Sequence, residues 1–159
     1  MINWIFDLDL TLYELNGPFS YANMRIPKNL RQQLLQLQGR RVMFTNGNLY
    51  HSLQCIKLFN LSRVFHKVLC RELTDLKPAI NSYIKAYHYA KMNTKDKCIF
   101  FEDTLVNLVM AKNFNWITVL IKKNPSQYEK SSKKVDYYFD NINDALNFFL
   151  QQQLNNTKK

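Results

Sequence analysis

The sequence contains few of the residues that interrupt regular structure, with only three glycines and four prolines among 159 residues. Hydrophobic residues make up 47% of the chain and aromatic residues 14%. Disordered chains are poor in large apolar side chains, so this composition predicts an ordered protein with one substantial core. We expect a single domain over residues 1–150, followed by a polar tail over residues 151–159.

Cysteine is scarce as well, and Cys55, Cys70 and Cys98 lie far apart. An odd number of cysteines without CxxC spacing argues against a disulfide framework and against a zinc motif, and favours buried, reduced thiols. The chain also lacks an apolar run of about 18 to 20 residues, which a membrane-spanning helix requires. The first residues show no basic leader and no small-residue cleavage site, so we expect a cytoplasmic protein that spans no membrane.

Acidic residues are few compared with basic ones: 12 Asp and Glu stand against 22 Lys and Arg, for a formal charge of +10. A positive surface attracts anionic substrates. The same charge could simply keep a Lys- and Asn-rich chain in solution, or it could belong to a surface that binds polyanions such as nucleic acid. The sequence leaves both readings open.

Apolar segments alternate with helical patterns along the chain. Leu30, Leu34 and Leu37 recur at helical spacing between Pro27 and Gly39, which is typical of a helix over residues 27–38. Strand and helix in alternation predict right-handed crossovers and a parallel sheet covered on both faces. We therefore expect an α/β fold, a Rossmann-like three-layer sandwich around a central, mainly parallel sheet of five to six strands. The expected strands lie at residues 4–6, 41–45, 67–70, 97–101, 116–121 and 137–139.

Further helices are expected where apolar residues repeat at helical spacing. The lysine-rich segment 122–134 contains Asn-Pro-Ser and is predicted to be a loop. The repeats that predict helices are Leu49, Leu53 and Ile56; Ile80, Ile84 and Tyr87; and Leu105, Leu108 and Ala111.

Two carboxylates, Asp7 and Asp9, directly follow the first expected strand in the segment Asp-Leu-Asp-Leu-Thr. In an extended strand the two side chains would share a face. A turn that begins here can separate them, so that one faces a phosphorus atom and the other faces its leaving oxygen. Paired acids also cap helices and solvate turns, so the pair alone is not specific for phosphoryl transfer.

Three later segments also follow expected strands and carry groups that phosphoryl transfer needs. Thr45 and Asn46 precede a helix and offer a hydroxyl and backbone amides to phosphate oxygens. Lys77 can neutralise a nucleophilic carboxylate and the transferring group. Glu102 and Asp103 end an apolar strand, and their hard oxygen ligands suit Mg²⁺. The carboxyl ends of parallel strands meet at one edge, so we expect these segments to form one site.

These segments together resemble the four ordered motifs of the haloacid dehalogenase superfamily, and the match spans nearly the whole chain. Three longer stretches are similar to the pyrimidine 5'-nucleotidase-like branch of that superfamily: FDLDLTLY at 6–13, FTNGNLYH at 44–51 and FEDTLVNL at 101–108. Leu10 departs from the pattern, because relatives often carry Asn, Asp or Gly there. The motif residues that carry the resemblance are Asp7, Asp9, Thr11, Thr45, Lys77, Glu102 and Asp103.

The resemblance implies a magnesium-dependent phosphatase. Asp7 would attack phosphorus and form an aspartyl-phosphate, while Asp9 would protonate the leaving group and then deprotonate water. Mg²⁺ would be held by Asp7, by the backbone carbonyl of Asp9 and by Asp103. Thr45, Asn46 and Lys77 would bind the phosphoryl oxygens. Thr11, Glu102 and Asn107 would support the site, the last two by orienting metal-bound waters or neighbouring loops.

The spacing between the motifs indicates which kind of substrate the site can admit. Only 33 residues separate Thr11 from Thr45, and 31 separate Thr45 from Lys77, which are the intervals where relatives insert a cap domain. We predict a chain without a cap, with a small flap at about residues 12–26. Tyr13, Phe19 and Tyr21 in the flap could stack on a base or an aromatic ring, and Asn48 and His51 beyond Thr45 could offer polar contacts. A local aromatic cluster and a simply exposed His51 are the favoured expectations.

Two substrate classes remain open. The resemblance to nucleotidases favours a nucleotide or another small phosphomonoester, whereas an open site and a basic surface suit phosphorylated protein or nucleic-acid ends. A third reading is a catalytically silent binding protein, but none of the expected catalytic groups is missing. A dehalogenase would share the fold without needing the proton shuttle of Asp9. The oligomeric state is not predicted.

Overall fold

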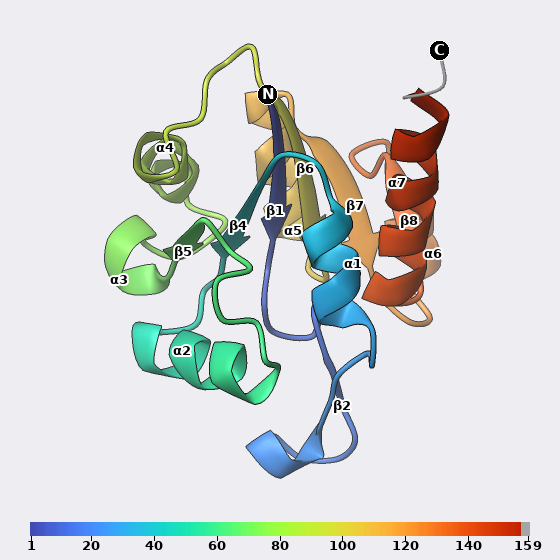
Figure 1. Ribbon diagram of the computed structural model, residues 1–159. Coiled ribbons are helices and arrows are strands. Elements are labelled where there is room, and N and C mark those ends of the chain that lie inside the picture. Colours follow the sequence, from blue (N-terminus) through green and yellow to red (C-terminus); the bar gives the residue numbers. More distant parts are fainter. Residues whose placement is uncertain (157–159) are drawn as a thin grey trace.

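A computed structural model describes residues 1–156 and contains a six-stranded sheet in the order β5-β4-β1-β6-β7-β8. Every neighbouring pair of strands in this sheet is parallel. The predicted strands and the predicted α/β sandwich are therefore confirmed, as Figure 1 shows. In sheet order the strands are β5 (Lys67–Leu69), β4 (Arg40–Phe44), β1 (Ile2–Phe6), β6 (Lys97–Glu102), β7 (Ile117–Ile121) and β8 (Tyr137–Phe139).

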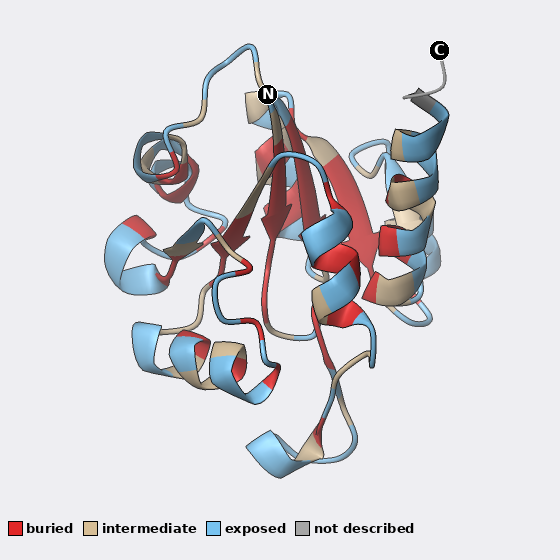
Figure 2. Ribbon diagram, in the orientation of Figure 1, coloured by how far each residue is buried: buried red, intermediate tan, exposed pale blue. Residues whose placement is uncertain are grey.

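Helices cover both faces of the sheet and enclose two separate cores (Figure 2). Alternate residues of β1 point to opposite faces, so Trp4 and Phe6 enter one core and Ile5 the other. The first core lies under α1 (Leu30–Gln36), α2 (Leu49–Leu58) and α7 (Ile142–Asn156), and the second lies under α4 (Ile80–Tyr89) and α5 (Leu105–Ala111).

Two helices turn a different face inward from the one that their leucine and isoleucine spacing predicts. In α2 the buried residues are Ser52 and Cys55, whereas Leu49 and Leu53 are exposed. In α4 the buried residues are Ser82, Tyr83 and Ala86, and Ile80 and Ile84 are exposed. The inward faces of both helices therefore carry small or polar residues together with Tyr83, and the larger aliphatic residues remain outside. The predicted faces of α1 and α5 are correct.

The segment between the first strand and α1 forms a flap, which we define as residues 14–25. It consists of a short antiparallel pair, β2 (Glu14–Leu15) with β3 (Met24–Arg25), joined through the 3-10 turn η1 (Tyr21–Asn23). In Figure 1 the flap lies below the carboxyl ends of the strands, beside α2. The expected small flap is thus present, and the interval before β4 adds only α1 to it.

The remaining elements refine the expectations for the rest of the chain. The predicted loop at 122–134 contains a helical turn, α6 (Gln127–Lys130), because Ser126 and Glu129 form a reciprocal capping box. The predicted polar tail is helical up to Asn156, and residues 157–159 lie outside the described chain. None of the described helices has the length and apolar content that a bilayer-spanning segment requires. The other short elements are α3 (Arg71–Thr74) and η2 (Lys112–Phe114).

Candidate active site

Three adjacent strands deliver the predicted acidic and hydroxyl groups to one edge of the sheet. Asp7 follows β1, Thr45 follows β4, and Glu102 ends β6. The register places Phe6 beside Met43 on one side and beside Phe101 on the other, so the three strand ends are level. Topology alone therefore brings together residues that lie almost 100 positions apart in the chain.

A buried ammonium group joins two of the carboxylates. Lys77 Nζ donates to Asp7 Oδ1 at 2.8 Å and to Glu102 Oε2 at 2.6 Å. A third bond, to the carbonyl oxygen of Phe44, completes the three donors of the ammonium. Lys77 is 4% exposed and Glu102 is 1% exposed, so this cluster is almost fully shielded from water.

The backbone of Lys77 is fixed by the side chain of Asn46. The Lys77 N–H donates to Asn46 Oδ1 at 2.7 Å, and Asn46 Nδ2 donates to the Lys77 carbonyl at 3.0 Å. The two bonds connect the turn after β4 to the segment before α4, where the Lys77–Pro78 peptide is cis. The Asn46 side chain thus positions Lys77, and the predicted contact of Asn46 with phosphate stays a prediction.

The electrostatics of the cluster are unfavourable without a further positive charge. Burial, with the nearby charge of Glu102, raises the pKa of Asp7 to about 7. Burial likewise raises the pKa of Glu102 to about 7. Burial opposes the charge of Lys77, but Asp7 and Glu102 together hold its pKa above the usual value. One ammonium therefore does not fully compensate the two carboxylates beside it.

The chemistry of the donor set fits a hard divalent cation. Asp7, Glu102 and Asp103 each offer a carboxylate oxygen, and these oxygens lie within 4.8 Å of one another. Each carboxylate can accept more than one hydrogen bond per oxygen, so the bonds from Lys77 to Asp7 and to Glu102 leave lone pairs free for a cation. Oxygen donors of this kind suit Mg²⁺.

Buried polar atoms near this set support the same fit. Burial raises the pKa of Asp103, which a bound cation would lower again. Asn107 stands in the first turn of α5, and its Oδ1 is buried without a hydrogen-bond partner among the described residues. Such an orphaned acceptor requires a donor, and a metal-bound water is one suitable donor. The predicted supporting role of Asn107 agrees with this observation but stays a prediction.

The carboxylate of Asp9 is held apart from that of Asp7 and is not in the acidic group. Its Oδ1 accepts a hydrogen bond from the Tyr13 hydroxyl and lies 2.6 Å from His51 Nε2, the same distance as to Tyr13. The chain turns directly after Asp9, where Leu10 adopts a φ of 59°. The turn separates the two carboxylates, and any metal contact of Asp9 is left to its backbone carbonyl.

Thr11 and Thr45 both stand beside the nucleophile candidate. Thr11 Oγ1 donates to Asp7 Oδ2 at 3.2 Å, which fits the supporting role that the resemblance implies. Thr45 is fully buried, and its Oγ1 accepts the Gly47 N–H at 2.9 Å. The hydroxyl proton of Thr45 therefore stays available to an incoming anion.

Gly47 keeps space open between these groups. A Cβ at this position would lie 3.0 Å from the His51 ring, 3.2 Å from Thr45 Oγ1 and 3.5 Å from Asp9 Oδ2. Any larger residue would intrude between Thr45 and Asp9. The close approach explains why the turn before α2 carries a glycine.

The sequence offered His51 and Tyr13 as candidate ligand contacts, but it did not predict that both bind Asp9. The expectation that His51 would be simply exposed is wrong, because its side chain is 14% exposed and contacts Asp9. Tyr13 is buried and packs edge-on against Phe59. The expected aromatic cluster is present in part, since Phe19 and Tyr21 pack on each other and on His51. The signal in the sequence was the position of His51 in the first turn of α2, directly after the Thr-Asn-Gly turn.

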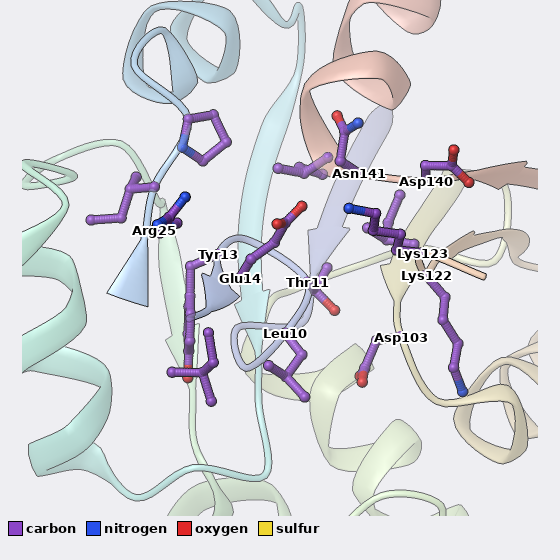
Figure 3. A pocket seen from close by; sticks show the side chains of 15 residues that line it. Leu10, Thr11, Tyr13, Glu14, Arg25, Asp103, Lys122, Lys123, Asp140 and Asn141 are labelled. Carbon is purple, nitrogen blue, oxygen red and sulfur yellow. The ribbon is translucent and has the colours of Figure 1, made fainter. Parts of the chain in front are cut away.

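A cavity of about 460 Å³ borders the acidic group on the side of the flap. Figure 3 shows Leu10, Thr11 and Asp103 along one side of it and Asp140 and Asn141 along another. Most of its lining is apolar, and charged side chains reach it from four segments of the chain. Those charged residues are Glu14 and Arg25 from the flap, Asp103, Lys122 and Lys123 after β7, and Asp140.

Solved structures share this architecture. The chain superposes on a putative haloacid dehalogenase-like hydrolase from Bacteroides fragilis with a TM-score of 0.71, 13% identity, and coverage of 90% of this chain and 98% of the other. The chain has the fold of the haloacid dehalogenase superfamily. An L-2-haloacid dehalogenase from Xanthobacter autotrophicus (TM-score 0.62, 15% identity, 81% and 62% coverage) and a HAD phosphatase from Thermococcus onnurineus (0.64, 17%, 81% and 60%) are also similar.

The similarity shows the fold and does not select an activity. The chain spans about three fifths of the length of that dehalogenase and of that phosphatase. These two HAD-fold proteins differ in their named activities, so the choice between hydrolysing a phosphate ester and hydrolysing a carbon–halogen bond depends on the residues of the site. No protein-family model matches the chain. The resemblance to the pyrimidine 5'-nucleotidase-like branch stays a prediction.

Proposed function

We propose that this protein is a magnesium-dependent phosphomonoester hydrolase that acts through an aspartyl-phosphate on Asp7. The observation that carries the proposal is the separation of two carboxylates that stand only two positions apart in the sequence. Asp7 is buried between Lys77 and Thr11, whereas Asp9 is held by Tyr13 and His51 on a more open side. This separation supports the assignment of Asp7 as the nucleophile and of Asp9 as the proton-transfer group.

The reaction proceeds in two displacements at phosphorus. In the first, a carboxylate oxygen of Asp7 forms a bond to phosphorus while the bond to the ester oxygen breaks, and Asp9 donates a proton to the departing oxygen. In the second, Asp9 takes a proton from water, whose oxygen attacks phosphorus and releases inorganic phosphate. Asp7 is regenerated as a carboxylate, and Asp9 is protonated again.

Cationic groups and hydroxyls hold the transferring group in place. Lys77 and the Thr45 hydroxyl stand beside Asp7 and would stabilise charge on the phosphoryl oxygens. Mg²⁺ bound by Asp7, Asp103 and the Asp9 carbonyl would supply Lewis-acid stabilisation of those oxygens. Glu102 keeps Lys77 in position through its 2.6 Å bond. We assign the protein to the cytoplasm as part of the same proposal.

The presence of Asp9 favours a phosphatase over a dehalogenase. Hydrolysis of a carbon–halogen bond releases a halide, which needs no proton from the enzyme. An alkoxide leaving group does need one, and Asp9 is held in two hydrogen bonds at the place where it can supply it. A nucleotide or another small phosphomonoester is the proposed substrate.

A second candidate function is a phosphatase for protein or nucleic-acid ends. The flap is the only added element between Thr11 and α1, so the edge of the sheet stays open to large substrates. Arg25, Lys122 and Lys123 line the cavity next to Asp103 and could contact further phosphates of a polymer. Hydrolysis of phosphorylated oligonucleotides that falls steeply with salt would favour this candidate over a small-molecule phosphatase.

The first experiment is hydrolysis of an aryl phosphate with and without Mg²⁺, by wild type and by Asp7→Asn. We expect magnesium-dependent turnover that Asp7→Asn abolishes. Asp75→Asn is the matched control, because Asp75 is an exposed carboxylate paired only with Lys85 on the surface. A panel from nucleoside monophosphates to phosphopeptides and phosphorylated oligonucleotides then ranks the substrates. A folded wild-type protein that turns over none of them with Mg²⁺ present would refute the proposal in favour of a silent binding protein.

A further inference from the structure

We propose that His51 is a positioning residue for the proton-transfer group Asp9, and that Tyr21 links this pair to the flap. The inference rests on the proposed phosphatase activity. It adds a chain of hydrogen bonds that runs from the flap to the acid and base of the reaction. The chain passes from the Tyr21 hydroxyl through both ring nitrogens of His51 to Asp9 Oδ1.

Two donors on one oxygen determine which atom of Asp9 transfers protons. The Tyr13 hydroxyl and His51 Nε2 both lie 2.6 Å from Oδ1. The Tyr13 hydroxyl is the donor in its bond, because a carboxylate oxygen can only accept. Because Oδ1 already accepts two hydrogen bonds, the proton that Asp9 transfers is carried by Oδ2. Oδ2 is also the oxygen that faces the space left open by Gly47.

The tautomer of His51 follows from its two oxygen partners, since Cys55 Sγ lies farther away, at 3.7 and 3.8 Å from the ring nitrogens. The Asp9 carboxylate accepts a hydrogen bond from Nε2–H, which leaves Nδ1 as an acceptor for the Tyr21 hydroxyl at 3.0 Å. The backbone N–H of His51 donates to Asn48 Oδ1 at 2.8 Å, which fixes the first turn of α2 from which the ring projects. The rings of Phe19 and Tyr21 lie 5.8 and 5.7 Å from that of His51.

The flap is built to present Tyr21 in a defined position. Ser20 Oγ accepts the Ala22 N–H at 3.2 Å and so caps the turn that carries Tyr21. Asn23 Nδ2 donates to the Pro18 carbonyl at 2.7 Å and closes the other side of the turn. Tyr21 at the tip of the flap holds the ring of His51, and His51 is one of the two donors to Asp9. Displacement of the flap therefore frees the His51 ring and weakens its bond to Asp9.

The first test uses leaving groups that differ in their need for a proton. The dinitrophenolate of a 2,4-dinitrophenyl phosphate leaves readily as an anion, whereas the alkoxide of an alkyl phosphate requires a proton from Asp9. We expect His51→Ala to lower kcat/KM by about 100-fold for an alkyl phosphate and by only a few-fold for the dinitrophenyl ester, since a well-placed general acid contributes on that scale. KM should change little, and His51→Gln, which retains a side-chain donor, should recover part of the loss.

Controls separate positioning from folding and from the underlying activity. His88→Ala removes an exposed histidine from α4 and should leave both esters unaffected. Equal losses on both esters in His51→Ala would refute the inference, while a wild type that hydrolyses neither ester would refute the proposed function instead. If His51→Ala does not fold, as judged by thermal melting, the comparison rests on His51→Gln.

A second test begins with a measurement that needs no turnover. Histidine ring ¹⁵N chemical shifts of the labelled protein should show His51 in the Nε2–H tautomer, and Tyr21→Phe should shift the Nδ1 resonance. Tyr21→Phe should also lower kcat/KM for the alkyl ester, by less than His51→Ala does. An Nδ1–H tautomer would overturn the assignment of the donors, and no effect of Tyr21→Phe on either measurement would overturn the link to the flap.

Discussion

Lys77 and Glu102 form an ion pair in the interior of the protein, with 2.6 Å between Nζ and Oε2. The role of Glu102 that the resemblance implies, orienting metal-bound waters or a loop, stays a prediction, and its contacts also include the lysine that faces Asp7. The nucleophile candidate thus belongs to a buried network of two carboxylates and one ammonium. The balance of charge in this network determines how the site responds to mutation and pH.

Replacement of Lys77 by Met should destabilise the fold in a pH-dependent way. The pKa values of Asp7 and Glu102 are about 7 in the folded protein, above the ordinary values of 3.8 and 4.5. Carboxyls with raised pKa values contribute stability that is present below about pH 4 and is lost as the pH rises through about 7. Without Lys77 the loss should be larger, so we expect a cost of about 3–5 kcal/mol at pH 8 and less at pH 5.5.

Urea unfolding at the two pH values measures this effect. Lys85→Met is the matched control, because Lys85 forms an exposed pair with Asp75 and should change the free energy of unfolding by less than about 1 kcal/mol. A Lys77→Met variant that is equally destabilised at both pH values would contradict the charge argument.

Magnesium should stabilise the folded protein even without a substrate. A ligand that binds only the folded state raises the melting temperature with its concentration, so Mg²⁺ from 0.1 to 10 mM should give a saturating increase that EDTA reverses. Asp103→Asn should remove most of this increase, because Asp103 is the most accessible carboxylate of the acidic group. Asp75→Asn should retain the increase in melting temperature. An unchanged increase in Asp103→Asn would show that Mg²⁺ binds at another site.

Replacement of Leu10 by Asn should stabilise the protein. Leu10 is 48% exposed and has a φ of 59°, a conformation that costs an ordinary residue about 1–2 kcal/mol and that Asn tolerates better. We expect a gain of about 1 kcal/mol in chemical unfolding. Leu35→Asn is the control, since Leu35 is 47% exposed within helix α1 and should gain nothing. A loss of stability in Leu10→Asn would mean that the Leu10 side chain contributes more at the cavity than its backbone costs.

Gly39 should not tolerate a side chain, because the chain passes β1 closely at this point. A Cβ there would lie 2.5 Å from the Ile2 carbonyl oxygen, in a backbone with φ of 118°. Gly17 has a similar φ of 114°, but its Cβ would meet only the Asn23 side chain, at 3.4 Å. Gly39→Ala should therefore cost about 2 kcal/mol more than Gly17→Ala in chemical unfolding, a difference that isolates the close contact from the shared backbone strain. Equal losses of stability in the two variants would show that the backbone shifts and relieves the contact between the new Cβ and the Ile2 carbonyl oxygen.

The cysteines should react slowly with thiol reagents while the protein is folded. Burial raises the pKa of Cys98 to about 11 and that of Cys55 to about 12, and the thiolate is the reactive species. At pH 8 the thiolate fraction is therefore far below that of a free cysteine, and the rate should continue to rise beyond pH 9. Titration with a chromogenic disulfide, in buffer and in guanidinium chloride, tests this. Rapid labelling of all three cysteines in buffer would contradict it.

The sequence predicted the sheet well because buried parallel strands are continuous apolar runs with polar residues at their ends. Asp7, Thr45 and Glu102 could be assigned to one edge for that reason. The faces of α2 and α4 could not be predicted, because Ser52 and Ala86 give no apolar signal although they are buried. Periodicity of large residues then indicates the wrong side of the helix.

Contacts between side chains that are far apart in the sequence could not be predicted from the sequence pattern either. The bond from His51 to Asp9 joins residues 42 positions apart and depends on how the first turn of α2 meets the turn after β1. The two bonds between Asn46 and the Lys77 backbone depend in the same way on two separate turns. Such contacts follow from tertiary geometry, and no local spacing encodes them.

The two outermost strands of the sheet, β5 and β8, are each only three residues long. An edge strand can recruit another chain only if it offers a row of unpaired backbone groups, and three residues offer very few. Growth of the sheet from one molecule to the next is therefore disfavoured at both margins. If copies of this protein associate, they should do so through side chains on the helices, such as the outward leucines of α2, and not through shared strands.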